Sequence, residues 1–229
     1  MKRNTRTRFI GIDTETTNGF VDADGKLNLS NSLVYDVGWE IIDEKGNTLK
    51  SRSYVVEEIF FDSFLMRKAF FADKIPAYSE EIKAKKRIVA PFKTIYFQFL
   101  KDRKKYNCHV VFAHNALFDY KALNTTLRYL TGSKRRFFFP RSLEVWDTLK
   151  MSRDVFKNDD KYNDFCSTNN YKTNHKIPQN RFTAEILYRF LTNNNDFTES
   201  HTGLEDVKIE KAIFLYCLNC GREIRRALF

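Results

Sequence analysis

The fold of this chain is decided by a short stretch near its start, RFIGIDTETT at residues 8–17. Its first half is apolar and predicts a buried β-strand, and its polar end carries two acids. Because side chains at i and i+2 of a strand point to the same face, Asp13 and Glu15 can both reach one metal ion. Two carboxylates beside an apolar strand repel each other, and a bound cation would compensate their charge. The alternative for this pair alone is an ordinary solvated strand end.

Outward from this stretch, the chain predicts a sheet that begins with a hairpin and continues with alternating strands and helices. Further strands are expected at Ser32–Asp43, Thr48–Glu57, Cys108–Ala113 and Leu143–Leu149. Helices are expected at Asp62–Phe71, Tyr78–Arg87, Pro91–Lys105, Leu117–Leu130, Met151–Phe156, Arg181–Leu191 and Glu205–Ala227. The Asn18–Ser32 region predicts a loop or a small hairpin, and the Asn-rich segment Asn158–Asn180 a mobile loop. Since no linker divides the chain, we expect a basic arm at residues 1–7 and a single α/β domain at residues 8–229.

Composition excludes several classes of protein. With 42% hydrophobic and 15% aromatic residues, most of the chain cannot be intrinsically disordered. No uncharged apolar run approaches the ~18 residues of a membrane span. The apolar stretch after the basic start ends at Asp13, too early for a secretory signal. Four cysteines do not make a disulfide framework in a chain of this length, so the expected location is the reducing cytoplasm.

Net charge gives a first indication of the partner. The chain has 39 Lys and Arg against 29 Asp and Glu, a formal charge of +10. This excess favours a polyanion, since Lys and Arg that neutralise phosphates release counterions. Codon bias accounts for the same excess, because residues encoded by AT-rich codons are plentiful throughout. Charge alone leaves both interpretations open.

Two further stretches carry acids in settings typical of ligand sites. The first, HNALFD at residues 114–119, follows a predicted buried strand, and α/β proteins place their ligands at the carboxyl ends of such strands. The second, HTGLED at residues 201–206, opens the last predicted helix. Taken singly, Asp119 and Asp206 are equally well interpreted as acids that stabilise a helix N-terminus.

Together, GIDTETT, HNALFD and HTGLED resemble, in sequence and in order, the three exonuclease motifs of the DnaQ-like (DEDDh) 3′→5′ exonucleases. The resemblance extends from about Arg8 to Cys220 and includes the strand VWDTL at residues 145–149. It implies a ribonuclease-H-like fold, with a five-stranded mixed sheet whose second strand is antiparallel and which is flanked by helices. A histidine five residues before Asp206 corresponds to the histidine branch of the family.

The resemblance also implies roles for individual residues. Its metal-binding acids correspond to Asp13, Glu15, Asp119 and Asp206, and its general base corresponds to His201. Its contacts to the terminal nucleotide correspond to Thr16, Thr17 and Asn115. The chemistry of the residues agrees, because four acids suffice to hold two Mg²⁺ or Mn²⁺ ions ~3.5–4 Å apart, and such a pair stabilises the attacking and leaving oxygens of a phosphodiester. Free imidazole titrates near ~6.5, so His201 is suited to accept a proton from water at neutral pH.

The expected function is therefore a metal-dependent 3′→5′ exonuclease that acts on single-stranded ends and releases nucleoside 5′-monophosphates. DNA is the favoured substrate, with a role in replication or repair, and proofreading would require a polymerase partner in trans. One alternative is an exoribonuclease of the RNase T or oligoribonuclease kind, because the motifs do not report on the sugar. Another is a catalytically silent nucleic-acid-binding protein on the same fold. No membrane partner is expected.

Several secondary signals each have two interpretations. The Ile59–Lys86 segment is expected to cover the sheet through Phe60, Phe61, Phe64, Leu65 and Phe71, rather than to contact nucleic acid. Basic clusters that could follow a nucleic-acid strand lie at Lys83–Arg87, Lys101–Lys105, Lys134–Arg136 and Arg222/Arg225/Arg226, although such clusters are more often solvated faces. Cys217 and Cys220 form a CxxC pattern without a second pair of ligands, so they are expected to be core thiols.

Overall fold

The computed structural model describes residues 7–17, 20–21, 27–28, 31–67, 69, 75–134, 136–221 and 224–228. Apart from residue 7, the expected basic arm lies outside the described residues, as do Phe71, Arg135 and Arg222.

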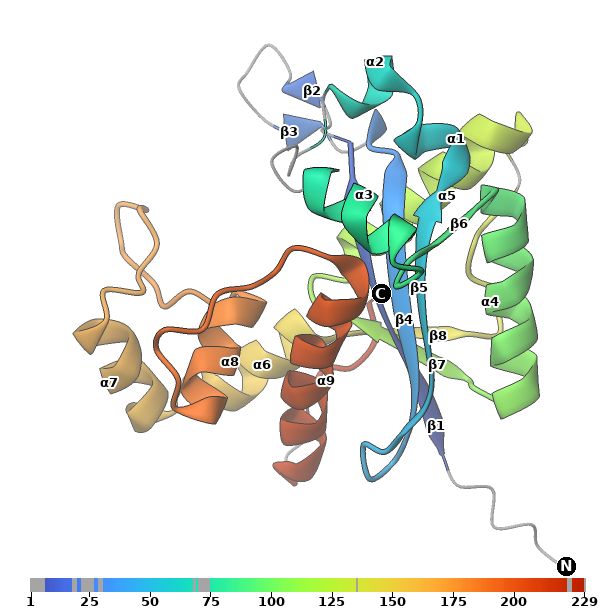
Figure 1. Cartoon of the computed structure of the whole chain (residues 1–229). Helices are drawn as coiled ribbons and strands as arrows, with labels where there is room; N and C mark the ends of the chain where they lie inside the picture. Colours follow the sequence, from blue (N-terminus) through green and yellow to red (C-terminus); the bar gives the residue numbers. More distant parts are fainter. Residues whose placement is uncertain are drawn as a thin grey trace, which may run out of the picture.

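A six-stranded mixed sheet forms the centre of the molecule (Figure 1), with the strand order β6-β5-β4-β1-β7-β8. The strands are β1 (Arg8–Thr16), β4 (Val34–Asp43), β5 (Thr48–Val56), β6 (Ile88–Ala90), β7 (Val110–Ala113) and β8 (Glu144–Asp147). A separate two-stranded hairpin consists of β2 (Phe20–Val21) and β3 (Leu27–Asn28). β1 pairs antiparallel with β4 and parallel with β7, as the expected topology requires.

The expectation of five strands was wrong by one. The additional strand is β6, which pairs parallel with β5 at the edge of the sheet. Its three residues stand between a helix and Pro91, and a segment that short has no periodicity for a sequence pattern to detect.

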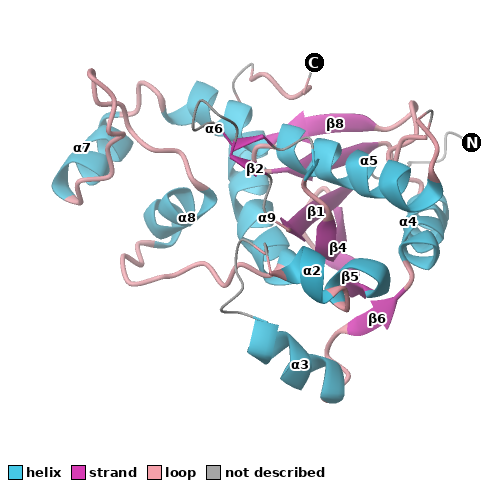
Figure 2. Cartoon of the chain, turned by 90° about the horizontal axis from the view of Figure 1, so that it is seen from above, coloured by secondary structure: helices cyan, strands magenta, loops and turns pink. Residues whose placement is uncertain are grey.

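Helices cover both faces of the sheet (Figure 2). They are α1 (Glu57–Phe60), α2 (Ser63–Met66), α3 (Ile75–Lys83), α4 (Phe92–Tyr106), α5 (Leu117–Thr131), α6 (Thr148–Phe156), α7 (Asp160–Thr168), α8 (Ala184–Thr192) and α9 (Gly203–Asn219). Alternate residues of β1 serve the two faces: Ile10 and Ile12 pack with α4 and α5, and Phe9 packs with α6, α8 and α9. This alternation is what a strand buried on both faces requires. Within the described helices, none is long and apolar enough to cross a membrane.

The segment expected to be a mobile loop, Asn158–Asn180, contains α7. Two residues of this helix, Tyr162 and Cys166, are fully buried, and the Tyr162 hydroxyl donates to the carbonyl oxygen of Arg181. Polar composition suggested a loop, but these two buried side chains hold the segment against α8 and α6. The last helix was also predicted too long, because α9 ends at Asn219 rather than at Ala227.

The Ile59–Lys86 segment covers the sheet, although not with the stripe that its aromatic residues suggested. Ile59, Phe60 and Met66 are buried in the core, whereas Phe61 and Phe64 are 65% and 66% exposed. Short helices account for the difference, since α1 and α2 have four residues each and cannot continue a common apolar face. Cys217 is buried as expected for a core thiol, whereas Cys220, which was expected to be one too, is half-buried.

Candidate active site

One cleft of about 1180 Å³ brings together the residues that the three motifs supply. Its lining includes the four predicted acids and the predicted base, which are Asp13, Glu15, Asp119, Asp206 and His201. Thr16 and Asn115 line the same cleft. Thr17 is not among the lining residues, and its hydroxyl instead accepts a hydrogen bond of 3.1 Å from the backbone nitrogen of Leu33.

The end of β1 connects the two helices that carry the other acids. Asp13 pairs with Gly38 of β4, on the face that α9 covers. Thr14 points to the other face, where its Oγ1 donates a hydrogen bond of 2.8 Å to Oδ1 of Asp119 at the start of α5. Because successive side chains of a strand point to opposite faces, the end of β1 contacts α5 on one face and α9 on the other. The acids of these two helices therefore lie around Asp13 and Glu15.

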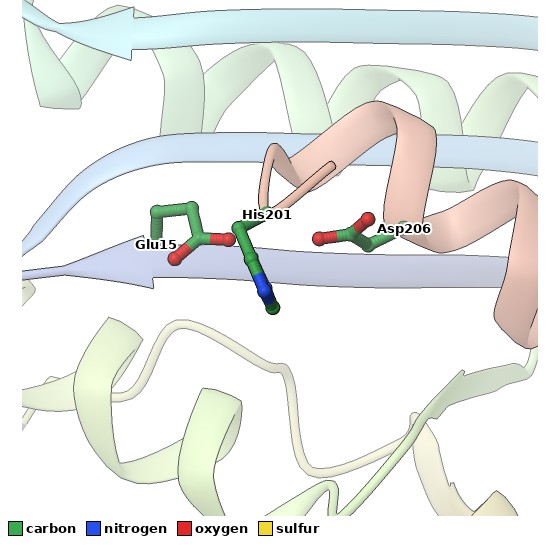
Figure 3. Close-up of side chains that lie close together, drawn as sticks. All are labelled: Glu15, His201 and Asp206. Atoms are coloured by element: carbon green, nitrogen blue, oxygen red, sulfur yellow. The ribbon is translucent and has the colours of Figure 1, made fainter. Parts of the chain in front are cut away.

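The turn before α9 positions the third motif. Oδ2 of Asp206 accepts a hydrogen bond of 3.0 Å from the backbone nitrogen of Thr202, and Oδ1 accepts one of 3.3 Å from Ser200 Oγ. The backbone of His201 is in the left-handed region, with φ of 54°. These contacts bring one ligand atom from each of Glu15, His201 and Asp206 within 4.8 Å of one another (Figure 3).

A buried network behind the cleft fixes the first residue of α9. Oδ2 of Asp36, on β4, accepts from the Tyr78 hydroxyl at 2.7 Å, from Arg87 Nη1 at 2.7 Å and from the Gly203 backbone nitrogen at 3.0 Å. Asp36 is fully buried and Arg87 is 6% exposed. Arg87, expected to belong to a basic surface cluster, is therefore a buried partner of Asp36.

The acids of the cleft share one electrostatic property. Burial raises the pKa of Glu15 to about 9 and that of Asp206 to about 8, and their mutual repulsion adds to the effect on Glu15. Burial raises the pKa of Asp119 to about 7 although the hydrogen bond from Thr14 opposes the shift. The pKa of Asp13 is also well above its usual range, through burial and the charges of Asp119 and Glu210. Without a cation, this cluster retains protons near neutral pH.

Sequence reasoning assigned no role to Glu210, His114 and Glu199, which also line the cleft. Glu210 lies one turn after Asp206, and its Oε1 accepts a hydrogen bond of 2.9 Å from the His114 backbone nitrogen. The His114 ring is held by Thr148 Oγ1 at 3.0 Å and the Phe182 carbonyl at 2.7 Å, and burial lowers its pKa. Glu199 precedes the third motif, and burial raises its pKa to about 7. The sequence did contain a signal for Glu210, because it stands four residues after Asp206 and residues at that spacing share one face of a helix.

Comparison with solved structures finds this arrangement of strands and helices in known nucleases. The nuclease domain of 3′hExo, a DEDDh family member bound to rAMP, is 13% identical with a TM-score of 0.61, over 97% of this chain and 97% of that one. A full-length 3′-exonuclease is 12% identical with a TM-score of 0.60, over 96% and 85% of the two chains. This chain has the fold of the DEDDh exonucleases.

A third structure with the DEDDh exonuclease fold is E. coli exonuclease I in complex with a dT13 oligonucleotide. It is 10% identical with a TM-score of 0.54, over 93% of this chain and 41% of that one. No protein-family model and no curated protein sequence matches the chain. The resemblance inferred from the three motifs is thus confirmed in the fold, at identities too low for overall sequence similarity to reveal.

The residues of this cleft fit a divalent metal ion. No Lys or Arg of the described residues forms an ion pair with Asp13, Glu15, Asp119, Asp206 or Glu210. Oε2 of Glu210 is buried without a hydrogen-bond partner among the same residues. Carboxylate oxygens are the ligands that hard divalent cations prefer, and such cations would compensate the repulsion that raises these pKa values.

Basic side chains also line the cleft, and they come from a different part of the fold. Arg153 and Lys157 lie on or next to α6, and Arg181 precedes α8. Among the described residues, none of the three forms an ion pair. Arg225 lines the cleft too, but it is paired with Asp154 at 2.8 Å. The cleft therefore combines an acidic centre with cations on the side of α6 and α8.

Proposed function

We propose that this protein is a metal-dependent 3′→5′ exonuclease that removes nucleoside 5′-monophosphates from single-stranded nucleic acid. The observation that carries the proposal is the convergence of Asp13, Glu15, Asp119, His201 and Asp206 in one cleft of a DEDDh-type fold. A binding module has no need of four acids at the place where a phosphate must approach, because carboxylates alone repel it.

Asp13, Glu15, Asp119 and Asp206 would hold two divalent ions, Mg²⁺ or Mn²⁺. When bound, these ions would supply electrostatic stabilisation to the attacking and leaving oxygens. His201 accepts a proton from the attacking water as the general base, and its place beside Glu15 and Asp206 suits this role. Thr16 and Asn115 line the cleft, where they would contact the terminal nucleotide. Thr17 would act indirectly, because its backbone nitrogen donates to the carbonyl oxygen of Leu33 and so fixes the end of β1.

The reaction is a hydrolysis. The oxygen of water forms a bond to the phosphorus of the last phosphodiester, and the bond from phosphorus to the 3′ oxygen of the preceding nucleotide breaks. The proton removed by His201 is returned to solvent, and the leaving 3′ oxygen takes up one proton. The products are a nucleoside 5′-monophosphate and a strand shortened by one nucleotide.

Single-stranded DNA is the preferred substrate in this proposal, and RNA is the alternative. Both are compatible with the fold, since 3′hExo was crystallised with rAMP and exonuclease I with a DNA oligonucleotide. The cations Arg153, Lys157 and Arg181 suit the phosphates of either strand. We place the activity in the single domain at residues 8–229 and in a reducing cytoplasm, since four cysteines do not make a disulfide framework in a chain of this length. The proposed role is in replication or repair, with proofreading dependent on a polymerase in trans.

A time course on 5′-labelled DNA and RNA oligonucleotides with Mg²⁺ tests the proposal. Wild type should give a ladder that shortens from the 3′ end, and Asp13→Asn should lose at least about 10³-fold in rate, because one metal-binding charge is gone. Glu44→Gln is the matched control, since Glu44 is an exposed acid in the turn between β4 and β5. The ratio of the DNA and RNA rates identifies the substrate.

Two results would overturn the proposal. Cleavage of a circular substrate would indicate an endonuclease, because a circle has no 3′ end. Binding of oligonucleotides without cleavage, equal in wild type and Asp13→Asn, would indicate the catalytically silent binding protein instead.

A further inference from the structure

Glu210 occupies a place in the cleft that none of the three motifs accounts for. It lies on α9 four residues after Asp206, so the two side chains share one face of the helix. Glu210 is only 3% exposed, yet it lines the same cleft as the four motif acids. A carboxylate so buried needs a partner that compensates its charge, because an unpaired ion in the interior of a protein is strongly destabilising.

The two oxygens of Glu210 have different surroundings. Oε1 accepts the hydrogen bond of 2.9 Å from the backbone nitrogen of His114, at the end of β7. Oε2 is buried and has no hydrogen-bond partner among the described residues. No Lys or Arg among the described residues forms an ion pair with Glu210 either. The described part of the fold thus supplies a partner for one oxygen and none for the other.

The charges that raise the pKa of Glu210 are acidic. After burial, the charge of Asp119 is the largest influence that raises the pKa of Glu210, and Glu210 in turn raises the pKa of Asp13. A carboxylate placed among acids without a protein cation is destabilising, unless the ligand of the site is itself a cation.

We propose that Glu210 is a fifth carboxylate of the divalent-cation site, with Oε2 directed at a bound ion or its hydration shell while Oε1 holds the backbone of His114. The inference rests on the proposed function, which calls for divalent ions in this cleft. It goes beyond that function, because the four motif acids do not include this residue. Glu210 also links the site to the turn of the second motif, because it holds the backbone of His114. Binding of a cation is therefore coupled, through this one side chain, to the position of His114 and Asn115.

Titration of the metal-free full-length chain with MnCl₂ alone tests this role without substrate. Isothermal titration calorimetry and electron paramagnetic resonance of free Mn²⁺ give affinity and stoichiometry for wild type, Glu210→Gln and Glu205→Gln. The glutamine at 210 keeps an oxygen to accept from His114 but removes the charge, so Mn²⁺ affinity should fall at least about tenfold, or one ion should be lost. Glu205 is the matched control, because it lies on the same helix, is exposed and pairs with Lys208. Its variant should bind as wild type does.

A thermal melt in EDTA separates this role from a purely structural one. At pH 8, Glu210→Gln should melt at or above the temperature of wild type, because it removes a buried carboxyl group that must take up a proton when the metal-free protein folds. Glu210→Ala should melt lower, since it also leaves the His114 nitrogen without an acceptor.

Two results would overturn the inference. Mn²⁺ binding by Glu210→Gln with wild-type affinity and stoichiometry would mean that Oε2 has no part in the site. Failure of Glu210→Gln to fold in EDTA would show that the charge is needed for the fold itself. A wild type that binds Mn²⁺ but cleaves no oligonucleotide would instead remove the proposed function and leave the role of Glu210 intact.

Discussion

Gly203, the first residue of α9, lies so close to Gly38 of β4 that neither position has room for a side chain. A Cβ atom on Gly38 would be 2.2 Å from the backbone nitrogen of Leu204 and 2.5 Å from the carbonyl carbon of Gly203. A Cβ atom on Gly203 would be 2.7 Å from the backbone nitrogen of Gly38. Because Gly38 also pairs with Asp13 in the sheet, this contact fixes the distance between the first and third motifs.

Replacing Gly38 by alanine should therefore damage stability and activity together. The added methyl group meets backbone, which cannot rotate away, so the cost should be about 3 kcal/mol, at the upper end of the range for an overpacked core. Displacement of α9 should also weaken Mn²⁺ binding. Calorimetric melting and Mn²⁺ titration measure the two effects.

Gly132→Ala provides the control for the Gly38 variant. Gly132 ends α5 with φ of 64°, and no described residue lies within 4 Å of an added Cβ, so only about 1 kcal/mol of backbone strain is expected there. If Gly38→Ala melts no lower than Gly132→Ala, the start of α9 is not in close contact with the backbone of β4, and the prediction is wrong.

Stability of the metal-free protein should fall as pH rises from 6 to 8.5. The pKa of Glu15 is about 9 and that of Asp206 about 8 in the folded protein, whereas unfolded carboxyls titrate near ~4. Between these values the folded protein binds more protons than the unfolded chain, so the free energy of unfolding decreases with pH. The contribution is fully present below about pH 4 and is lost as pH rises through 8 to 9.

Thermal melts in EDTA and in Mg²⁺ measure this dependence. In EDTA, the change from pH 6 to 8.5 should lower Tm by about 4 °C or more, and Mg²⁺ should remove most of the difference by replacing the protons. Glu15→Gln should flatten the EDTA curve. A Tm in EDTA that rises with pH over this interval would contradict the raised pKa values.

The Asp36 network should be essential for stability although it lies outside the motifs. Asp36→Asn removes the buried one of the two carboxylates that pair with Arg87, the other being Glu81, and weakens the hydrogen bond to the Gly203 nitrogen. Because Arg87 then keeps only its pair with the more exposed Glu81, the protein should lose about 3 kcal/mol, at the lower end of the range for a broken buried ion pair. Urea unfolding measures the loss, with Glu80→Gln as the control at an exposed pair with Lys83. Equal midpoints for the two variants would mean that Asp36 does not support α9.

The site could be predicted from the sequence where its residues are close together along the chain. Asp13 and Glu15 share a strand end, and the His201 to Asp206 spacing opens a helix, so local periodicity and the family resemblance were sufficient to identify residues that lie in one cleft. Their catalytic roles stay predictions. The contact of Gly38 with Gly203 and the bond of Gly203 to Asp36 join segments more than 160 residues apart. No local pattern reports such contacts, because a glycine in a strand can equally mark a bulge or a bend.

Errors in the fold have similar physical causes. β6 is too short to show an alternation of apolar and polar residues, and it is stabilised as a strand by its pairing with β5. α7 has a polar sequence and is held by Tyr162 and Cys166, whose burial depends on α6 and α8. In both cases tertiary contacts decide what local preference leaves open.

If the protein binds a single strand of nucleic acid as proposed, the path of that strand can be assigned by comparing two sets of three cations. Arg153, Lys157 and Arg181 line the cleft, and none of them was among the clusters that the sequence suggested. Lys101, Lys104 and Lys105 on α4 belong to one of those clusters, and all three are exposed. If the strand leaves the cleft along α6 and α8, only the first set contacts phosphates.

Salt dependence distinguishes the two paths. Fluorescence anisotropy of a labelled dT12 oligonucleotide, in an Asp13→Asn background to prevent cleavage, gives the slope of log K against log salt. Replacing all three cleft cations by glutamine should reduce the magnitude of this slope by about 2, since each phosphate contact to a single strand contributes about 0.7. The same replacement at Lys101, Lys104 and Lys105 should leave the slope unchanged. The reverse result would place the strand along α4, and it would mean that the cations beside α6 and α8 serve only to balance the charge of the acids.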